Sequence, residues 1–213
     1  MNTLKADTPV EEVASSLTHG LGAVLSIVGL FALIWRDETP LPALHVTSYT
    51  VFGGSMVVLY LASTLYHAFF RNKRLYRIFQ LIDHSAIYVL IAGTYTPFTL
   101  ITIKGSSGIW MFVIIWLMAI SGVIFKFFFI GKYKRLSLLF YLIMGWVGAF
   151  FYRDLLNELK EDGFNLLLLG GLSYSIGVVF YIWNKLPFNH AIWHLFVMGG
   201  SAFLYFCIYH YVR

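Results

Sequence analysis

The 213-residue sequence is short of charged residues and of cysteine. Charged side chains make up 12% of the chain, against roughly 25% in a typical soluble domain, while 59% of its residues are hydrophobic. So few charges exclude a disordered chain, a coiled coil and an ordinary soluble enzyme, because each of these needs a well-solvated surface. Cys207 is the single cysteine, which excludes an intramolecular disulfide and a cysteine-based zinc site.

The sequence also has little that is typical of a basic nucleic-acid-binding face or of a removable signal peptide. The net charge is +5, but Lys and Arg stand in short clusters between apolar runs, unlike the basic face of a nucleic-acid-binding domain. The first 16 residues hold Asp7, Glu11 and Glu12 with a single lysine, and no small-residue cleavage site follows the first apolar run. We therefore expect neither nucleic-acid binding nor a removable signal peptide.

Long apolar runs dominate the chain instead. A membrane-spanning helix needs about 20 mostly apolar residues, and no strand-like alternation competes with these runs. We predict an all-α, seven-transmembrane helix bundle in one domain over residues 1–213, with a short tail over residues 1–16. The predicted spans are residues 17–35, 46–70, 78–103, 108–125, 136–152, 164–183 and 187–212.

Lys and Arg are unevenly distributed between the two ends of these spans. The tail and the second, fourth and sixth loops hold 10 of them, including Lys5 and the clusters at residues 71–77 and 126–135. The opposite side holds 5, including Lys104. By the positive-inside rule, this asymmetry predicts a cytoplasmic N-terminus and a C-terminus outside.

Several ionisable side chains fall inside the predicted spans, and those near the cytoplasmic ends include His19, His67, Asp83, His190 and His194. Such groups are expensive in hydrocarbon and are therefore candidate functional residues. At a rise of 1.5 Å per residue, they lie at depths of roughly 5–10 Å from the charged boundary. The predicted orientation rests on Lys and Arg alone. The convergence of these histidines and Asp83 in one layer of the membrane is therefore an observation independent of it.

The spacing of the histidines indicates a metal site. His190 and His194 are four residues apart, so both imidazoles project from one helix face, and His67 lies at the matching depth on another helix. Three neutral imidazoles with an open fourth position are typical of catalytic zinc sites. Asp83 would then bind water at the metal or orient a ligand, and Ser63, four residues before His67, would donate a hydrogen bond into the site.

Structural roles remain as alternatives for several of these residues. Asp83 could be a helix-start carboxylate favoured by the helix dipole, and Ser63 an interhelical hydrogen-bond donor. We expect His19 to be an interface residue rather than a ligand. His84 should point about 100° away from Asp83 on a helix, which favours an interhelical or supporting role.

These residues carry a resemblance to a known family. The matching segments are residues 11–20, Ser63-x-x-x-His67, residues 83–97 and His190-x-x-x-His194, and they resemble the bacterial hemolysin III family, the prokaryotic branch of the progestin and adipoQ receptor family. The likeness covers essentially the whole chain and departs at Ser15, where the family usually has Asn.

This resemblance implies a multi-pass protein of the bacterial inner membrane with seven spans and the N-terminus inside. It also implies Zn²⁺ held by His67, His190 and His194, with Asp83 contacting water at the zinc and Ser63 belonging to the shared pattern. The wider superfamily includes alkaline ceramidases, which hydrolyse an amide in a membrane lipid.

Three functions fit the sequence. The first is a zinc-dependent hydrolase of a lipid amide or ester, in which Asp83 moves the proton and Ser63 stabilises the oxyanion. The second is a non-enzymatic lipid sensor or receptor with a structural zinc site. The third is a cytolytic pore, which is disfavoured because the outer halves of the spans hold almost no ionisable residues. In each case the expected partners are membrane lipids, with a lipid in an intramembrane cavity for the first two.

Overall fold

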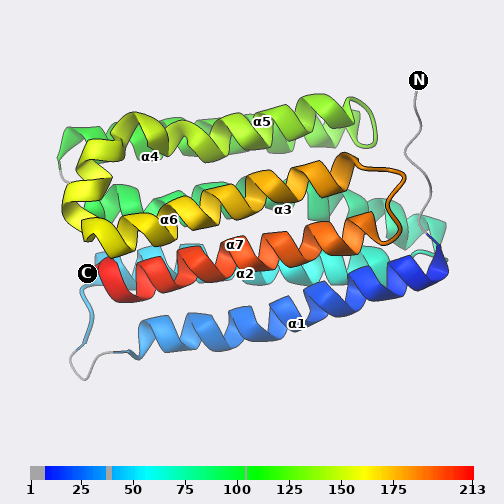
Figure 1. The fold of residues 1–213 in the computed structure, drawn as a ribbon, viewed down its shortest axis with the longest axis horizontal. Coiled ribbons are helices and arrows are strands. Elements are labelled where there is room, and N and C mark those ends of the chain that lie inside the picture. The colour runs from blue at the N-terminus through cyan, green and yellow to red at the C-terminus, as the bar shows by residue number, and fades with distance from the viewer. Residues whose placement is uncertain (1–7, 37–39, 104) are drawn as a thin grey trace.

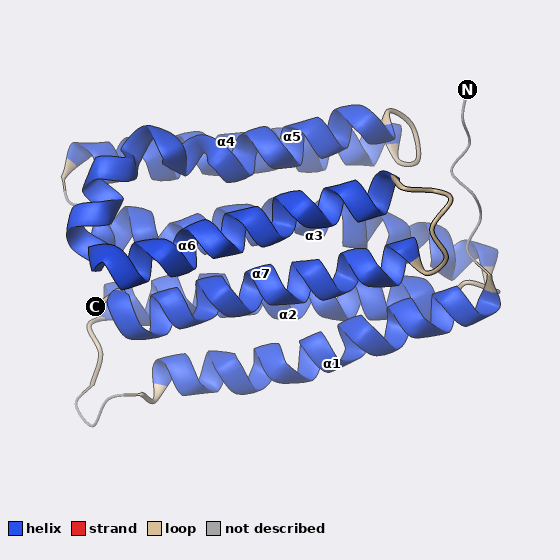
Figure 2. Cartoon of the chain, in the orientation of Figure 1, coloured by secondary structure: helices blue, strands red, loops and turns tan. Residues whose placement is uncertain are grey.

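The computed structural model describes residues 8–36, 40–103 and 105–213, and every regular element within these ranges is helical. Lys5 and Lys104, which entered the count of basic residues, lie outside the described residues. Seven α-helices lie side by side along a common axis and are joined at the two ends of the bundle (Figures 1 and 2). In chain order the elements are α1 (Pro9–Ile34), α2 (Ala43–Ala68), α3 (Lys73–Pro97), η1 (Phe98–Thr102), α4 (Ser106–Phe129), α5 (Lys134–Trp146), η2 (Val147–Phe151), α6 (Tyr152–Ile182) and α7 (Asn189–Tyr211).

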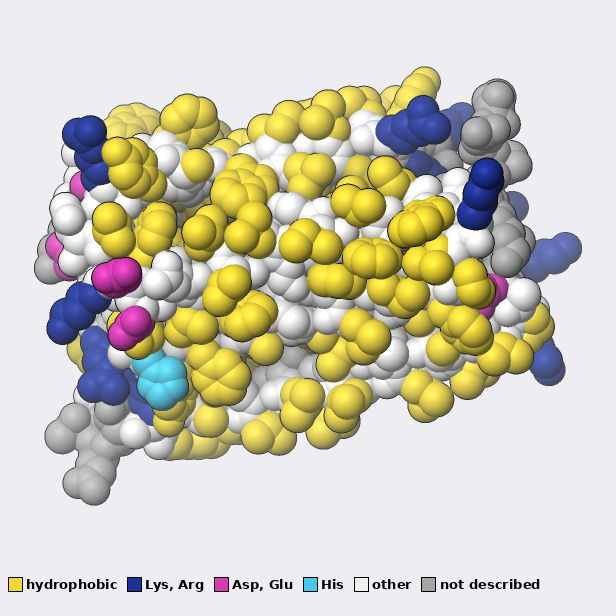
Figure 3. All heavy atoms as spheres, in the orientation of Figure 1, with side chains coloured by type: hydrophobic (Ala, Val, Ile, Leu, Met, Phe, Trp, Pro, Cys, Tyr) yellow, Lys and Arg dark blue, Asp and Glu magenta, His cyan; other side chains and the backbone are white. Residues whose placement is uncertain are grey.

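The outer surface of the bundle is apolar, as a membrane protein requires. On α1, the outward positions Leu17, Leu21, Val24 and Val28 recur every three or four residues and are 56–69% exposed. In a soluble protein this helix face would be polar. Figure 3 shows hydrophobic side chains covering the middle of the molecule, while Lys and Arg gather at its two ends.

Six helical segments among the described residues are long and apolar enough to cross a membrane. One of them, Lys134–Ile182, is 49 residues long and combines α5, η2 and α6. The predicted all-α class is therefore confirmed. The number of seven spans and their orientation stay predictions.

The α5–α6 region differs most from the predicted spans. α5 has only 13 residues and passes through the short 3₁₀ turn η2 into α6, which starts at Tyr152 rather than near residue 164. Lys160 breaks α6 with non-helical angles of φ 57° and ψ 175°. Figure 1 shows the chain reversing around this region, so that α5 and the later part of α6 lie as separate rods. The first turns of α6 thus belong to the reversal.

The first helix begins at Pro9, well before the predicted start at residue 17. Thr8 and Glu11 form a capping box: the Glu11 N–H donates to Thr8 Oγ1 at 3.3 Å, and the Thr8 N–H donates to Glu11 Oε2 at 2.7 Å. Pro9 suits the first helical position because that residue needs no hydrogen-bond donor. The added turns carry Glu11 and Glu12 out of the expected tail and into buried positions.

Close packing is concentrated on two sides of the bundle. The pairs α1–α2, α2–α3 and α6–α7 pack most extensively, and glycine allows the closest approaches. A methyl group at Gly177 of α6 would lie 2.7 Å from Cβ of Phe196 on α7. α5 packs much less extensively against its neighbours, and a cavity lies between it and α3, α6 and α7.

Candidate metal centre and its cavity

Three histidines predicted as metal ligands come together at one end of the bundle. His67 lies in the last turn of α2, while His190 and His194 lie in the first turns of α7. Each offers a ligand atom, and these atoms all lie within 4.8 Å of one another. The His67 and His194 rings are buried and His190 is half-buried. Helices distant in sequence therefore supply a donor set that suits one metal ion.

Helix α1 orients two of these imidazoles. Nδ1 of His67 lies 2.7 Å from Oε2 of Glu12, and Nδ1 of His194 lies 3.2 Å from the Ser15 carbonyl oxygen and 3.3 Å from Thr18 Oγ1. The Thr18 hydroxyl donates to backbone carbonyls of its own helix, so it can accept from His194. In both rings Nδ1 is thus the hydrogen-bond donor, and Nε2 is the nitrogen that can bind a metal.

The neighbouring carboxylate, Glu11, joins the starts of α1 and α7. Its Oε1 accepts a hydrogen bond from the backbone N–H of Phe188 at 3.0 Å, while its Oε2 accepts the hydrogen bond from the Thr8 N–H in the capping box. Phe188 precedes α7 in a left-handed conformation with φ 57°, so this contact fixes the entry of the helix that carries two of the histidines. Neither Glu11 nor Glu12 was predicted as a site residue from the sequence. For Glu11 the signal was present in the capping pattern Thr8-x-x-Glu11, whereas no such pattern marks Glu12.

Asp83 and Ser63 are buried and line the same cavity as His190 and His194. The Ser63 hydroxyl lies near the Asp83 carboxylate, but no hydrogen bond of normal geometry joins its Oγ to any described residue. Nδ1 of His84 lies 3.5 Å from Oδ2 of Asp83 and 2.8 Å from the Gln80 carbonyl oxygen. His84 therefore contacts the carboxylate, which agrees with the supporting role expected for it, although helical spacing alone set the two side chains about 100° apart.

His19 is not the interface residue that we expected. It is 3% exposed and stacks on His194, with ring centroids 3.4 Å apart and an interplanar angle of 12°. Its ring also forms a T-shaped contact with the Tyr60 ring, with centroids 4.9 Å apart. Within the described part of the chain neither of its ring nitrogens has a hydrogen-bond partner. His19 thus forms part of the cavity wall against a candidate ligand.

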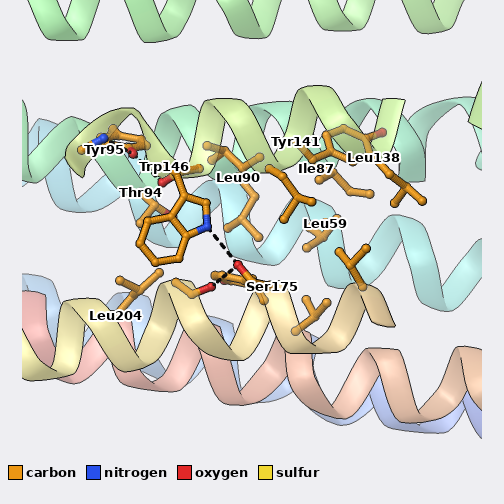
Figure 4. Close-up of a pocket in the computed structure, with 18 of the residues that line it drawn as sticks. Leu59, Ile87, Leu90, Thr94, Tyr95, Leu138, Tyr141, Trp146, Ser175 and Leu204 are labelled. Carbon is orange, nitrogen blue, oxygen red and sulfur yellow. Dashed lines mark hydrogen bonds between the residues drawn. The ribbon is translucent and has the colours of Figure 1, made fainter. Parts of the chain in front are cut away.

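The cavity next to the histidines has a volume of about 550 Å³, within the usual range for small-molecule sites. We call the part of the cavity lined by Ser63, Asp83 and His190 its polar end. The rest of the lining is mostly apolar, with Leu59, Leu90 and Leu204 among the residues drawn in Figure 4. The Trp146 indole of α5 donates to Ser175 Oγ of α6 at 3.0 Å, which ties these two helices together beside the cavity (Figure 4).

Lys126 corrects a further expectation. Its place in the cluster at residues 126–135 predicted a position in the basic loop after the fourth span. In the structure Lys126 lies within α4, is only 2% exposed and lines the cavity. Together with Glu11 and Glu12, it shows that several charged side chains are buried near the histidines.

Comparison with known proteins gives a consistent result over nearly the whole chain. A family model described as haemolysin-III related matches residues 8–205. The chain is 51% identical over 202 residues to Hemolysin-3 of Bacillus cereus, covering 95% of this chain and 92% of that protein. It is 49% identical over 201 residues to a Hemolysin-3 homolog of Bacillus subtilis (strain 168), covering 94% of each. It is also 35% identical over 210 residues to the human monocyte to macrophage differentiation factor, covering 96% of this chain and 86% of the human protein.

Proposed function

This chain belongs to the haemolysin-III-related family of multi-pass membrane proteins, and from that premise we propose that it is a zinc-dependent hydrolase of a lipid amide or ester. We further propose seven spans in the bacterial inner membrane, with the histidines toward the cytoplasm. One observation carries the proposal. Three imidazoles cluster beside a mostly apolar cavity, and two of them line it together with a carboxylate and a serine hydroxyl.

The donor set fits zinc. Three imidazoles are the ligands of well-known catalytic zinc sites, and hydrogen bonds from the remote ring nitrogen to a carboxylate or carbonyl are typical of such ligands. Glu12 and the Ser15 carbonyl make these contacts to His67 and His194. When bound, zinc would polarise the scissile carbonyl and make a water molecule more acidic.

The remaining steps belong to the protein's own side chains. The Asp83 carboxylate would accept a proton from the attacking water as the new C–O bond forms. It would then deliver that proton to the leaving amine or alcohol as the C–N or C–O bond breaks. Ser63 Oγ, buried beside Asp83, would donate a hydrogen bond to the oxygen on which negative charge develops.

The cavity accounts for a lipid substrate. Its apolar walls would hold an acyl chain and keep water away from all but the polar end. Such a chain would enter from the bilayer beside α5, the helix that packs least extensively. The same lining argues against a pore, because a conducting path is normally polar through the full membrane depth.

The test is hydrolysis by the purified, zinc-loaded protein. Ceramide and phospholipid vesicles would be incubated with the wild type and with a His190→Ala/His194→Ala variant, and released fatty acid measured. A His45→Ala/His210→Ala variant is the matched control, because it also loses two histidines but leaves the candidate site intact. We expect release with the wild type and the control only. Equal release from all three proteins would contradict the proposal.

A second candidate function rests on a different feature of the site. His67 comes from α2 and the other two histidines from α7, so a bound metal would cross-link two helices. In that case zinc would serve structure, and the cavity would bind a regulatory lipid without cleaving it. The two functions differ in what Asp83 does.

A further inference from the structure

The function proposed above gives no role to Lys126. This residue lies near the end of α4 and has one of the most deeply buried large side chains in the protein. A buried ammonium group is costly in a membrane protein unless an anion or a polar cavity compensates it. Its position therefore calls for a compensating partner.

The described residues offer only part of that compensation. Lys126 Nζ lies 5.7 Å from the centroid of the Tyr141 ring, which gives a cation–π contact. No described residue forms a hydrogen bond or ion pair with it, although Asp83 and Lys134 are charged neighbours. Asp83 is thus near enough to attract Lys126 but does not form an ion pair with it.

Lys126 also lines the cavity that contains Asp83, Ser63 and His190. Lys134, at the start of α5, adds a second positive charge to the same lining. Glu11 and Glu12 lie outside this lining, so Lys126 and Lys134 outnumber Asp83 among the charged residues that line the cavity, before any metal is bound. A molecule that brings its own anion would correct this imbalance.

We propose that Lys126 binds an anionic group, a carboxylate or a phosphate, on the headgroup of the lipid that occupies this cavity. The acyl chain lies along the apolar walls, the scissile carbonyl lies near the histidines, and the anion contacts Lys126. This assignment rests on the proposed lipid-binding role of the cavity and adds a substrate class to it. A neutral lipid such as ceramide is then the weaker ligand.

The test uses three ether lipids without a carboxylic amide or ester bond, so that binding is measured apart from the proposed hydrolysis. They are 2-(hexadecyloxy)ethanol, 2-(hexadecyloxy)acetic acid and 2-(hexadecyloxy)ethyl phosphate, which share one chain and differ in the charged group. Their dissociation constants would be measured for the purified protein in neutral detergent. We expect at least one anionic lipid to bind about tenfold more tightly than the alcohol, as for a charge-assisted hydrogen bond in a protected site.

Four variants distinguish binding by Lys126 from a general attraction of anionic lipids to a basic protein. Lys126→Met should abolish the preference and leave the affinity for the alcohol unchanged, whereas Lys126→Arg should keep it. Lys132→Met, which removes an exposed lysine outside the cavity lining, is the matched control and should behave as the wild type. Lys134→Met tests the second lysine of the lining.

Three outcomes would overturn the assignment. The first is that the wild type binds all three lipids with equal affinity. This outcome needs no variant, so the proposal can be tested even if Lys126→Met fails to fold. A preference for the anionic lipids that persists in folded Lys126→Met would also overturn it. So would a preference that is lost in Lys134→Met but kept in Lys126→Met. Failure to detect hydrolysis would contradict the proposed enzyme but would not alter these affinities.

Discussion

Oε2 of Glu12 lies 2.7 Å from Nδ1 of His67, and this contact joins the first turn of α1 to the last turn of α2. Both side chains are buried, so solvent does not weaken the interaction. The carboxylate holds the imidazole in one orientation and leaves Nε2 to face a metal.

Loss of this carboxylate should weaken metal binding. We expect Glu12→Ala to lower zinc affinity by about 10- to 100-fold, because the His67 ring loses the partner that fixes its tautomer. Competition with a chromophoric chelator measures the affinity. Glu161→Ala, which removes an exposed carboxylate from α6, is the control. Unchanged affinity in folded Glu12→Ala would show that His67 is not a ligand oriented in this way.

Removal of a ligand should remove the metal itself. Wild-type protein purified without added chelator should carry about one zinc ion per chain, and His67→Ala should carry much less, because three donors become two. Elemental analysis of both proteins decides this. His45→Ala should keep the wild-type content, since His45 lies outside the cluster. Full metal content in His67→Ala would remove it from the donor set.

Asp83→Asn separates the two candidate functions. Asparagine retains the size of the side chain but cannot accept a proton, so hydrolysis should fall by about 10²- to 10⁴-fold. Zinc content should stay at the wild-type level, because Asp83 is not among the three proposed ligands. If a strain lacking the protein is complemented equally well by Asp83→Asn, the lipid-sensor role is favoured over the hydrolase.

The α6–α7 contact should tolerate no added methyl group. Gly177→Ala would place Cβ 2.7 Å from Phe196 Cβ and 2.8 Å from the Trp193 ring, and should destabilise the fold by about 1–3 kcal/mol. Thermal unfolding in detergent measures this as a lower midpoint.

Gly54→Ala is the matched control for that substitution. The added Cβ would meet no heavy atom of the described residues within 4 Å, and alanine favours a helix over glycine. Its midpoint should equal or exceed that of the wild type. A Gly177→Ala protein as stable as Gly54→Ala would mean that α6 and α7 pack less closely than described.

The sequence by itself determined the class of the protein and the identity of the histidine cluster. Apolar runs of membrane length leave helices as the main possibility, because in hydrocarbon each backbone polar group must be satisfied within the protein. The four-residue spacing of His190 and His194 places both on one helix face, and their shared depth with His67 follows from helical rise alone. These inferences needed only local geometry and the cost of burying polar groups.

Only the tertiary structure decided which side chains surround that cluster. Glu12, His19 and Lys126 were assigned to a tail, an interface and a loop, because hydropathy cannot distinguish a charged residue at a helix end that faces water from one that faces the bundle interior. That difference depends on how far α1 and α4 extend and on their rotation against α2, α3 and α7. Such long-range packing sets the partners of the histidines and leaves Lys126 beside the cavity.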